Sequence, residues 1–255
     1  MAIRSNREKM AEGVPLAMII KREMKVFPEL VMLSQPRSVY AERFRRLKTN
    51  LVHHYGDDAK VIVVTSGIPG EGKSTVSMNL ALAFATEESP RTLLIDGDLR
   101  RPSIGPKLNP PPQLGLTEVL DKRATLVHAI LQLSNAPLHV LPAGSKAGDP
   151  HQFLTSPEVK DLFLELRERY DRIIVDTPPI IPFTDADSLG ALSDGVILVA
   201  RAGTTPKSAY AQEVAAVTST KILGTVLNSS SGGLAGGKPY YDDYYHSYYD
   251  EDRKK

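Results

Sequence analysis

Short apolar runs alternate along the chain with longer segments in which apolar residues recur every three or four positions. The apolar runs, rich in β-branched residues, predict strands at 61–64, 91–96, 138–142, 172–176, 196–201 and 222–228. The longer segments predict helices at 40–55, 76–85, 116–122, 126–131, 157–169 and 207–219. Ser38 is the predicted cap of the first of these helices. The runs lack polar alternation, which is typical of strands buried on both faces of a parallel sheet. We therefore expect an α/β fold of three layers, with helices on both sides of a mostly parallel central sheet.

The segment between the first strand and the next helix has the spacing of a phosphate-binding loop, Gly67-x4-Gly72-Lys73-Ser74. Glycines let backbone N–H groups face phosphate oxygens, and the helix N-terminus adds partial positive charge. Lys73 can reach the β- and γ-phosphates, and the Ser74 hydroxyl can bind Mg2+. Because a strand precedes the loop and a helix follows it, we favour a P-loop NTPase over a flexible glycine turn. The expected nucleotide-binding residues are Gly67, Gly70, Glu71, Gly72, Lys73, Ser74 and Thr75.

Acidic residues follow two of the predicted strands. Asp96 and Asp98 follow one strand, and Asp176 ends another. The carboxyl ends of parallel strands are where α/β sheets bind ligands, and an acid downstream of a phosphate loop is typical of the Mg2+ site of a nucleotide hydrolase or kinase. A helix cap or an Asx turn is the structural alternative for Asp96 or Asp98 alone. For Asp185 and Asp187 we favour helix capping.

The two ends of the chain differ from this series of strands and helices. We expect an extended arm at 1–37, the P-loop domain at 38–228, and a flexible Gly/Ser linker with a tyrosine-rich tail at 229–255. Six of the ten tyrosines lie among acidic residues of the tail: Tyr240, Tyr241, Tyr244, Tyr245, Tyr248 and Tyr249. No aliphatic residue accompanies them, so core packing does not explain them. They form either an adhesive aromatic tail or an autophosphorylated segment, in which each phosphate adds about −1.5 to −2 charges.

Composition narrows the function classes. With 255 residues and 42% hydrophobic content, the chain can bury one sizeable core. A net charge of +1 gives no general attraction to nucleic acid or to an anionic membrane, and the absence of cysteine excludes disulfides and thiolate metal sites. No apolar run reaches the roughly 18 residues of a membrane-spanning helix, and no signal-peptide pattern opens the chain. We therefore expect a cytoplasmic location.

Together these motifs resemble the bacterial tyrosine kinases of capsular and exopolysaccharide assembly, which are P-loop enzymes similar in fold to the MinD and ParA ATPases. The resemblance covers residues 31–255. It rests on the phosphate loop, the segments LLIDGDLR and IIVDTPP, and the terminal tyrosines. In its terms 67–75 is Walker A, the run ending at 96–100 is Walker A′, and the run ending at 176–179 is Walker B. The MinD and ParA branch carries a lysine early in the loop, and its absence from 67–70 favours the kinase branch.

The resemblance implies a mechanism. ATP and Mg2+ are the expected cofactors, and the catalytic residues it implies are Lys73, Asp96, Asp98 and Asp176. The expected Mg2+ site consists of Ser74, Asp96, Asp98 and Asp176, directly or through water. Asp96 is the best candidate to accept the proton of the incoming tyrosine. The acceptors are the tail tyrosines of a neighbouring subunit in a ring.

The resemblance also implies partners. Glu42, Arg45 and Lys48 share one helix face, and spacing alone favours an ordinary solvated face. They match the Glu-x2-Arg-x2-Arg motif that holds the family's rings together, with Lys48 in place of the last arginine. Lysine lacks the planar guanidinium fork, so the ring contact is expected to be weaker or differently arranged. Other implied partners are a separate membrane adaptor of the polysaccharide co-polymerase type, which recruits the kinase to the inner face of the membrane, and a cognate tyrosine phosphatase. Nucleic acid is not expected.

Two alternatives remain open. One is an ATPase switch like MinD, with merely adhesive tyrosines, which the missing lysine disfavours. The other is a scaffold that binds nucleotide without turnover. The intact Walker acids disfavour it, because a protein without activity is free to lose them.

Overall fold

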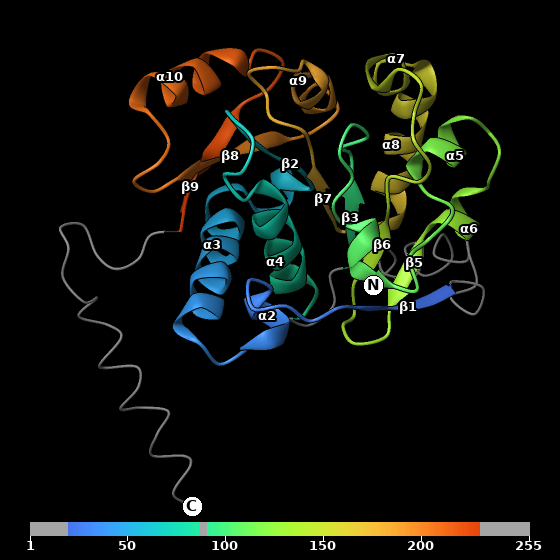
Figure 1. Ribbon diagram of the computed structural model, residues 1–255, viewed down its shortest axis with the longest axis horizontal. Helices are drawn as coiled ribbons and strands as arrows, with labels where there is room; N and C mark the ends of the chain where they lie inside the picture. Colours follow the sequence, from blue (N-terminus) through green and yellow to red (C-terminus); the bar gives the residue numbers. More distant parts are fainter. Residues whose placement is uncertain (1–19, 87–90, 230–255) are drawn as a thin grey trace, which may run out of the picture.

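The computed structural model describes residues 20–86 and 91–229. Within them, nine strands form one sheet in the order β4-β1-β5-β6-β3-β7-β2-β8-β9 (Figure 1). The strands are β1 (Ile20–Met24), β2 (Val61–Ser66), β3 (Thr92–Asp96), β4 (Leu108–Asn109), β5 (Leu131–Leu133), β6 (His139–Leu141), β7 (Arg172–Asp176), β8 (Gly195–Arg201) and β9 (Ile222–Asn228). The β1–β4 and β5–β6 pairs are antiparallel and the other described pairs are parallel, which confirms the predicted mostly parallel sheet.

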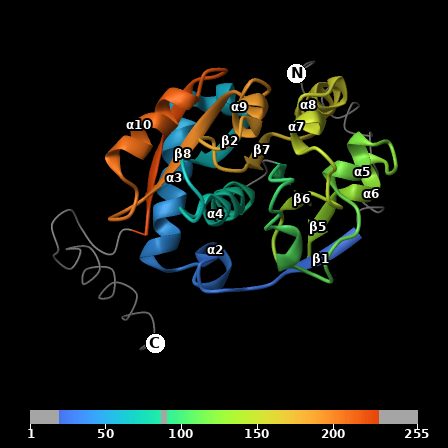
Figure 2. The same cartoon turned by 45° about the horizontal axis from the view of Figure 1, so that its top comes forward.

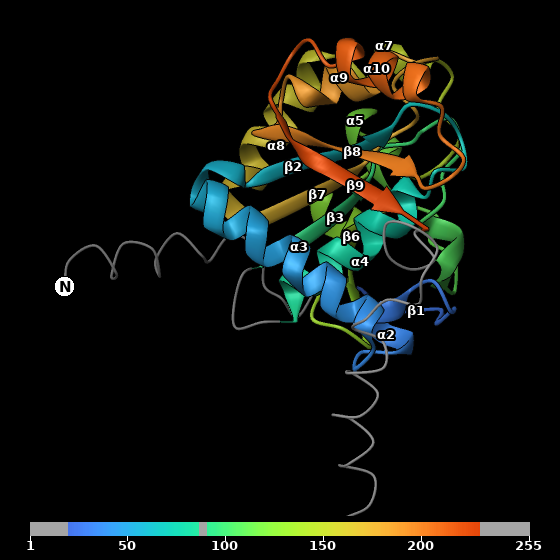
Figure 3. The ribbon, with the colours of Figure 1, turned by 90° about the vertical axis from the view of Figure 1, so that its left-hand side faces the viewer.

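Helices cover both faces of the sheet. The α-helices are α2 (Val31–Ser34), α3 (Val39–Tyr55), α4 (Lys73–Ala85), α5 (Leu116–Leu120), α6 (Leu126–Ala129), α7 (Pro150–Leu154), α8 (Pro157–Arg169), α9 (Asp185–Gly190) and α10 (Lys207–Ala216), and 3-10 turns lie at η3 (Gly56–Ala59) and η4 (Gly105–Lys107). Figure 3 shows α3 and α4 on one side of the sheet and α8, α9 and α10 on the other. This arrangement confirms the predicted three-layer α/β/α fold.

The central strands are buried on both faces, as their continuous apolar runs predict. Ile62 and Val64 of β2 pack towards α3 and α4, whereas Val61 and Val63 pack into the opposite core with residues of α8 and α9. Successive side chains of a strand point to opposite faces, so one run supplies both cores. The two cores hold the carboxyl ends of β2, β3, β7 and β8 in fixed register.

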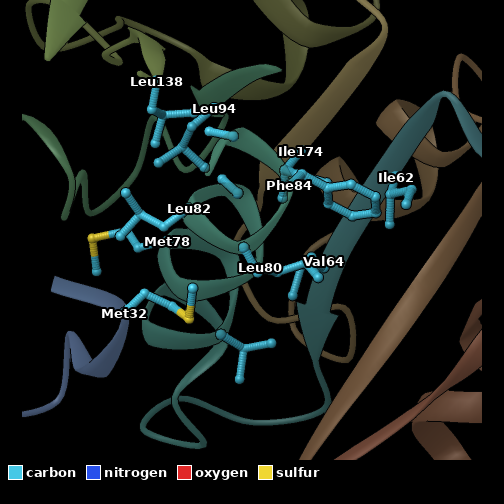
Figure 4. Packing of buried hydrophobic residues seen from close by; sticks show 14 of the residues in the cluster. Met32, Ile62, Val64, Met78, Leu80, Leu82, Phe84, Leu94, Leu138 and Ile174 are labelled. Atoms are coloured by element: carbon cyan, nitrogen blue, oxygen red, sulfur yellow. The ribbon is translucent and has the colours of Figure 1, made fainter. Parts of the chain in front are cut away.

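Helix α4, which follows β2 and the phosphate loop, is buried over most of its length. From Val76 to Ala85 every residue is buried, which fits a helix that is apolar nearly all round. In Figure 4 Phe84 lies beside Ile62 and Ile174, and Met78 lies on the side towards Met32 of α2. The core therefore anchors the helix whose first turn carries the phosphate loop's lysine and serine.

The segment expected to be an extended arm contributes to this domain from residue 20 onward. Strand β1 pairs with β5 and β4. Asn79 of α4 binds this segment, because its Oδ1 accepts from Met32 N at 3.0 Å and its Nδ2 donates to Glu29 O at 2.9 Å. Helix α3 begins after Ser38, whose Oγ accepts from Ala41 N at 3.1 Å and so confirms the predicted cap. The tyrosine cluster and the linker from residue 230 onward lie outside the described residues.

Two short elements differ from expectation. Residue 131, expected at the end of a helix, begins strand β5 instead. Helix α7 lies in a stretch where no helix or strand was predicted, and it packs beside α9 (Figure 2). Asp149 caps α7 through a bond from His151 N of 3.1 Å, and Pro150 occupies its first turn.

Candidate active site

The phosphate loop, residues 67–72, connects β2 to α4. Gly70 and Gly72 have φ angles of +86° and +93°, which L-residues with side chains rarely adopt. Within the loop Ile68 N donates to Oε2 of Glu71 at 3.0 Å, and Glu71 is almost fully buried. The buried carboxylate of Glu71 thus stabilises the loop from within. The sequence predicted Glu71 only as a nucleotide-binding residue and did not predict this structural role.

Residues at the end of β8, in the turn that follows it and at the end of β9 also support the loop. The Thr205 hydroxyl donates to Oε1 of Glu71, and Arg201 Nη1 donates to Gly70 O at 3.2 Å. Asn228 Nδ2 donates to Glu71 O at 2.8 Å. Sequence patterns did not mark these three residues. Their position at the carboxyl ends of strands beside the loop is the signal that could have found them.

Lys73 and Asp98 form an ion pair beside the loop. Lys73 Nζ lies 3.2 Å from Oδ2 of Asp98, and both side chains are largely buried. Asp98 is fixed by a second bond, from Arg101 N to Oδ1 at 2.9 Å. The lysine expected to bind phosphate is therefore held at the end of the A′ segment.

Asp96 and Asp176 lie opposite each other on neighbouring strands, in register between β3 and β7. Both are fully buried. Oδ2 of Asp96 accepts from the backbone N–H groups of Ser103 and Ile104, at 3.1 and 2.9 Å, while Oδ1 has no described partner. Asp176 accepts from the Ser77 hydroxyl at 3.1 Å through Oδ1, and its Oδ2 has no described partner.

The surroundings of the two carboxyl groups shift the pKa of each above its ordinary value. Burial raises the pKa of both, and the charge of Asp176 raises that of Asp96 further. The charge of Lys73 and the hydroxyls of Ser74 and Ser77 lower the pKa of Asp176. Ser74, Asp96, Asp98 and Asp176 therefore lie close enough to influence one another, and one oxygen each of Asp96 and Asp176 has no hydrogen-bond partner among the described residues.

These donors fit Mg2+ chemically, since Mg2+ prefers oxygen ligands and is usually held by one or two carboxylates together with phosphates and waters. Among the residues that the structure describes, no three His, Cys, Asp or Glu side chains group closely enough to hold a metal ion by themselves. Carboxylates, the Ser74 hydroxyl and phosphate oxygens together match this donor set.

Asp185 and Asp187 do not cap α9, contrary to expectation. The fully buried Asp185 binds Arg100 through two bonds, of 2.6 and 3.1 Å, and the Arg100 guanidinium lies 4.2 Å from the Phe183 ring centroid. Asp187 instead accepts from the backbone N–H groups of residues 218 and 219, at 2.9 and 3.0 Å. The capping interpretation was wrong because each carboxylate binds a segment distant in the sequence. The contact between Arg100 and Asp185 joins the A′ segment to the start of α9.

Glu42, Arg45 and Lys48 lie on α3, which contributes none of the site residues described above. Glu42 and Arg45 pair within the helix, and Arg45 Nη2 also donates to Pro36 O at 2.6 Å. Burial lowers the pKa of Lys48. The helix packs on α4, so this face and the phosphate loop belong to neighbouring helices.

Comparison with known proteins places this site in a family. The AAA domain family matches residues 59–218. Tyrosine-protein kinase YwqD of Bacillus subtilis (strain 168) is 35% identical over 216 residues, which are 84% of this chain and 91% of YwqD. The chain belongs to the bacterial tyrosine-protein kinases. This membership confirms the resemblance and the prediction of a protein-tyrosine kinase.

Two further likenesses agree with this family. The crystal structure of the chimerical protein CapA2B2 aligns with a TM-score of 0.75 and 31% identity, over 88% of this chain and 97% of that one. The succinoglycan biosynthesis transport protein ExoP of Rhizobium meliloti (strain 1021) is 32% identical over 206 residues, which are 78% of this kinase but 26% of ExoP. None of the helices that the structure describes has the length and apolar content to span a bilayer.

Proposed function

We propose that this kinase binds ATP and Mg2+ at the phosphate loop and transfers the γ-phosphate to the tail tyrosines of a neighbouring copy. The observation that carries the proposal is the proximity of Lys73, Asp98, Asp96 and Asp176 at the strand ends beside the loop. Two of their buried carboxylate oxygens have no hydrogen-bond partner within residues 20–86 and 91–229. Such buried carboxylates, clustered at one place, are typical of functional sites.

The loop residues would hold the nucleotide. Backbone N–H groups of the loop and of the first turn of α4 would bind phosphate oxygens, aided by the positive end of the helix. Lys73 would bind the β- and γ-phosphates. The ion pair with Asp98 holds the Lys73 ammonium group in the site before nucleotide binds. The donors proposed for Mg2+ are Ser74, Asp96, Asp98 and Asp176, directly or through water. When bound, Mg2+ supplies charge neutralisation on the phosphates.

Phosphoryl transfer depends mainly on positioning and charge neutralisation. As the tyrosine oxygen bonds to the γ-phosphorus, the hydroxyl must lose its proton, and the bond from the γ-phosphorus to the bridging oxygen must break so that ADP leaves. Asp96 is the proposed acceptor, because backbone N–H groups fix its Oδ2 and leave Oδ1 without a described partner. The proposed phosphate acceptors are Tyr240, Tyr241, Tyr244, Tyr245, Tyr248 and Tyr249.

The proposed assembly is a ring in which Glu42, Arg45 and Lys48 contact the next subunit. Several phosphates on each tail would then loosen the ring by repulsion. The name of ExoP, a succinoglycan biosynthesis transport protein, supports a role in polysaccharide synthesis and export. A separate membrane adaptor is the proposed partner that would recruit the kinase to the inner face of the membrane. A cognate tyrosine phosphatase would reset the tails.

Replacement of Lys73 by methionine tests this function. Intact-mass spectrometry before and after incubation with ATP and Mg2+, with peptide mapping of residues 238–255, is expected to show a ladder of phosphates on the unsubstituted protein and none on K73M. The variant K122M, at an exposed lysine of similar size, is the control and should label normally. A K73M ladder as strong as that of the unsubstituted protein would contradict the assignment. Phosphate release without labelling, even with an adaptor segment present, would instead support the ATPase switch.

A further inference from the structure

A buried carboxyl group behind the phosphate loop has no role in the function described so far. Glu213 is the buried residue of α10, a helix that lies beside β8 in Figures 1 and 2. Its side chain is 0% exposed, and neither oxygen has a hydrogen-bond partner among the described residues. Burying an unpartnered carboxylate is costly, so a neutral carboxyl group suits this place better than an ion.

Glu213 touches the first residue of the loop. A Cβ placed on Gly67 would lie 3.2 Å from Cβ of Glu213, 3.3 Å from its Oε2 and 3.1 Å from Cδ1 of Ile181. Gly67 is thus enclosed between α10 and the segment after β7, and a side chain there would displace one of them. The position of Gly67 therefore depends directly on how Glu213 is placed.

A second carboxyl group, Glu71, acts on Glu213 from within the loop. Glu71 accepts hydrogen bonds at both of its oxygens, from Ile68 N and from the Thr205 hydroxyl. Burial raises the pKa of Glu213 to about 8, and the charge of Glu71 adds to this rise. The backbone N–H groups of Gly67 and Val199 are near enough to lower the pKa in part, although neither has the geometry of a hydrogen bond to Glu213. The two carboxyl groups flank the first half of the loop.

The other neighbouring elements bring different groups. From the end of β8, Arg201 directs Nη1 to Gly70 O at 3.2 Å. The segment after β7 presents Ile181, which is apolar. On α10 itself the first residue is the exposed Lys207, and Tyr210 is hydrogen-bonded to Thr225 of β9. Among the charged groups, Glu71 therefore has the largest effect on the pKa of Glu213, and its negative charge raises that pKa.

We propose that Glu213 is a positioning residue for the phosphate loop, and that nucleotide binds when its carboxyl group is neutral against Gly67. An ionised Glu213 would repel Glu71 and weaken the bonds of Glu71 to Ile68 and Thr205. It would also place a second negative charge behind a loop that must receive phosphates. This inference rests on the nucleotide site proposed above.

The proposal predicts how strongly nucleotide affinity should depend on pH. If only the neutral form binds, the apparent dissociation constant rises as the inverse of the neutral fraction. With a pKa of about 8, that fraction falls from roughly 0.9 at pH 7 to roughly 0.1 at pH 9, so nucleotide affinity should fall about 10-fold. Binding must in turn take up a proton, about half a proton per site at pH 8.

Isothermal titration of the full chain with ADP and excess Mg2+ tests this at pH 8, in two buffers of different ionisation enthalpy. The unsubstituted protein should take up about half a proton more than E213Q, whose neutral amide cannot titrate. Between pH 7 and pH 9 the nucleotide affinity of E213Q should stay nearly constant, whereas that of the unsubstituted protein should fall about 10-fold. The matched control is E168Q, at an exposed position of α8, which should keep the full proton uptake and the 10-fold fall.

The outcomes separate this inference from the function on which it rests. Nucleotide binding with equal proton uptake in the unsubstituted protein and in E213Q would overturn the role of Glu213 and leave the nucleotide site standing. An unsubstituted protein that binds no ADP at all would overturn the nucleotide site and this inference together. If E213Q does not fold, E213M supplies a second neutral side chain of similar length for the same comparison.

Discussion

Replacement of Gly72 by alanine separates two reasons for a glycine at the end of the phosphate loop. Gly70 and Gly72 have nearly the same left-handed backbone, with φ angles of +86° and +93°. A Cβ at Gly70 would meet no atom within 4 Å, whereas a Cβ at Gly72 would overlap Nδ2 of Asn228 and lie 3.3 Å from its Cγ. The two positions therefore share the conformational cost of alanine and differ in the space available.

The structure sets the size of each cost. Left-handed backbone costs a residue with a side chain about 1–2 kcal/mol, which is the expected loss for G70A. In G72A the Asn228 amide must also move, and its bond to Glu71 O at 2.8 Å is lost. That bond adds about 1 kcal/mol. In a domain of this size G72A should then melt about 2–4 °C below G70A.

Urea denaturation and thermal melting of G70A, G72A, N228A and the double variant G72A/N228A measure these costs. The double variant has no amide to displace, so its loss of stability should be smaller than the sum of the two single losses by about 1 kcal/mol. Equal stability of G70A and G72A would refute the steric argument. Strict additivity in the double variant would refute the role of Asn228.

Two further predictions concern the scaffold. S38A removes the cap of α3, where Ala41 N donates to the serine hydroxyl at 3.1 Å, and should lower the free energy of unfolding by about 1 kcal/mol in urea, whereas S38N should keep most of it. F84A empties a 1% exposed position beside Ile62 and Ile174 and should cost about 3–5 kcal/mol, while L164A, at a position 56% exposed, should stay within about 0.5 kcal/mol. An unchanged S38A, or an F84A as stable as L164A, would contradict the respective assignment.

The centre of the fold is predictable from sequence because its elements carry their own signals. Strands β7 and β9 and helix α8 have the predicted bounds, since continuous apolar runs and a proline in the first turn mark them locally. Strand β1 carries no such signal, because its sequence IKREM is largely polar. It is a strand because Ile20 pairs with Leu131 of β5 and Glu23 with Asn109 of β4. Strand pairing between distant segments cannot be predicted from the sequence of either segment alone.

The candidate site divides in the same way. The glycine spacing and the acids that end two strands predict the loop, Asp96 and Asp176, and the structure brings these together. The supporting residues Asn228 and Glu213 lie far along the chain from the loop, and no local pattern marks either. Glu213 belongs to a helix whose other residues are at least partly exposed, so its burial arises from contact with Gly67 and could not be inferred from the periodicity of α10.

The unpartnered carboxylates explain why the loop needs so much support. Asp96, Asp176 and Glu213 each bury oxygens without a described partner, and each such group opposes folding. The surrounding structure offsets this cost, since α4 is buried from Val76 to Ala85. Asn79 also binds the segment before α3 to α4, and α3 packs on α4 as well. The subunit contact proposed on α3 would therefore act on a helix that packs against α4, the helix that begins with Lys73.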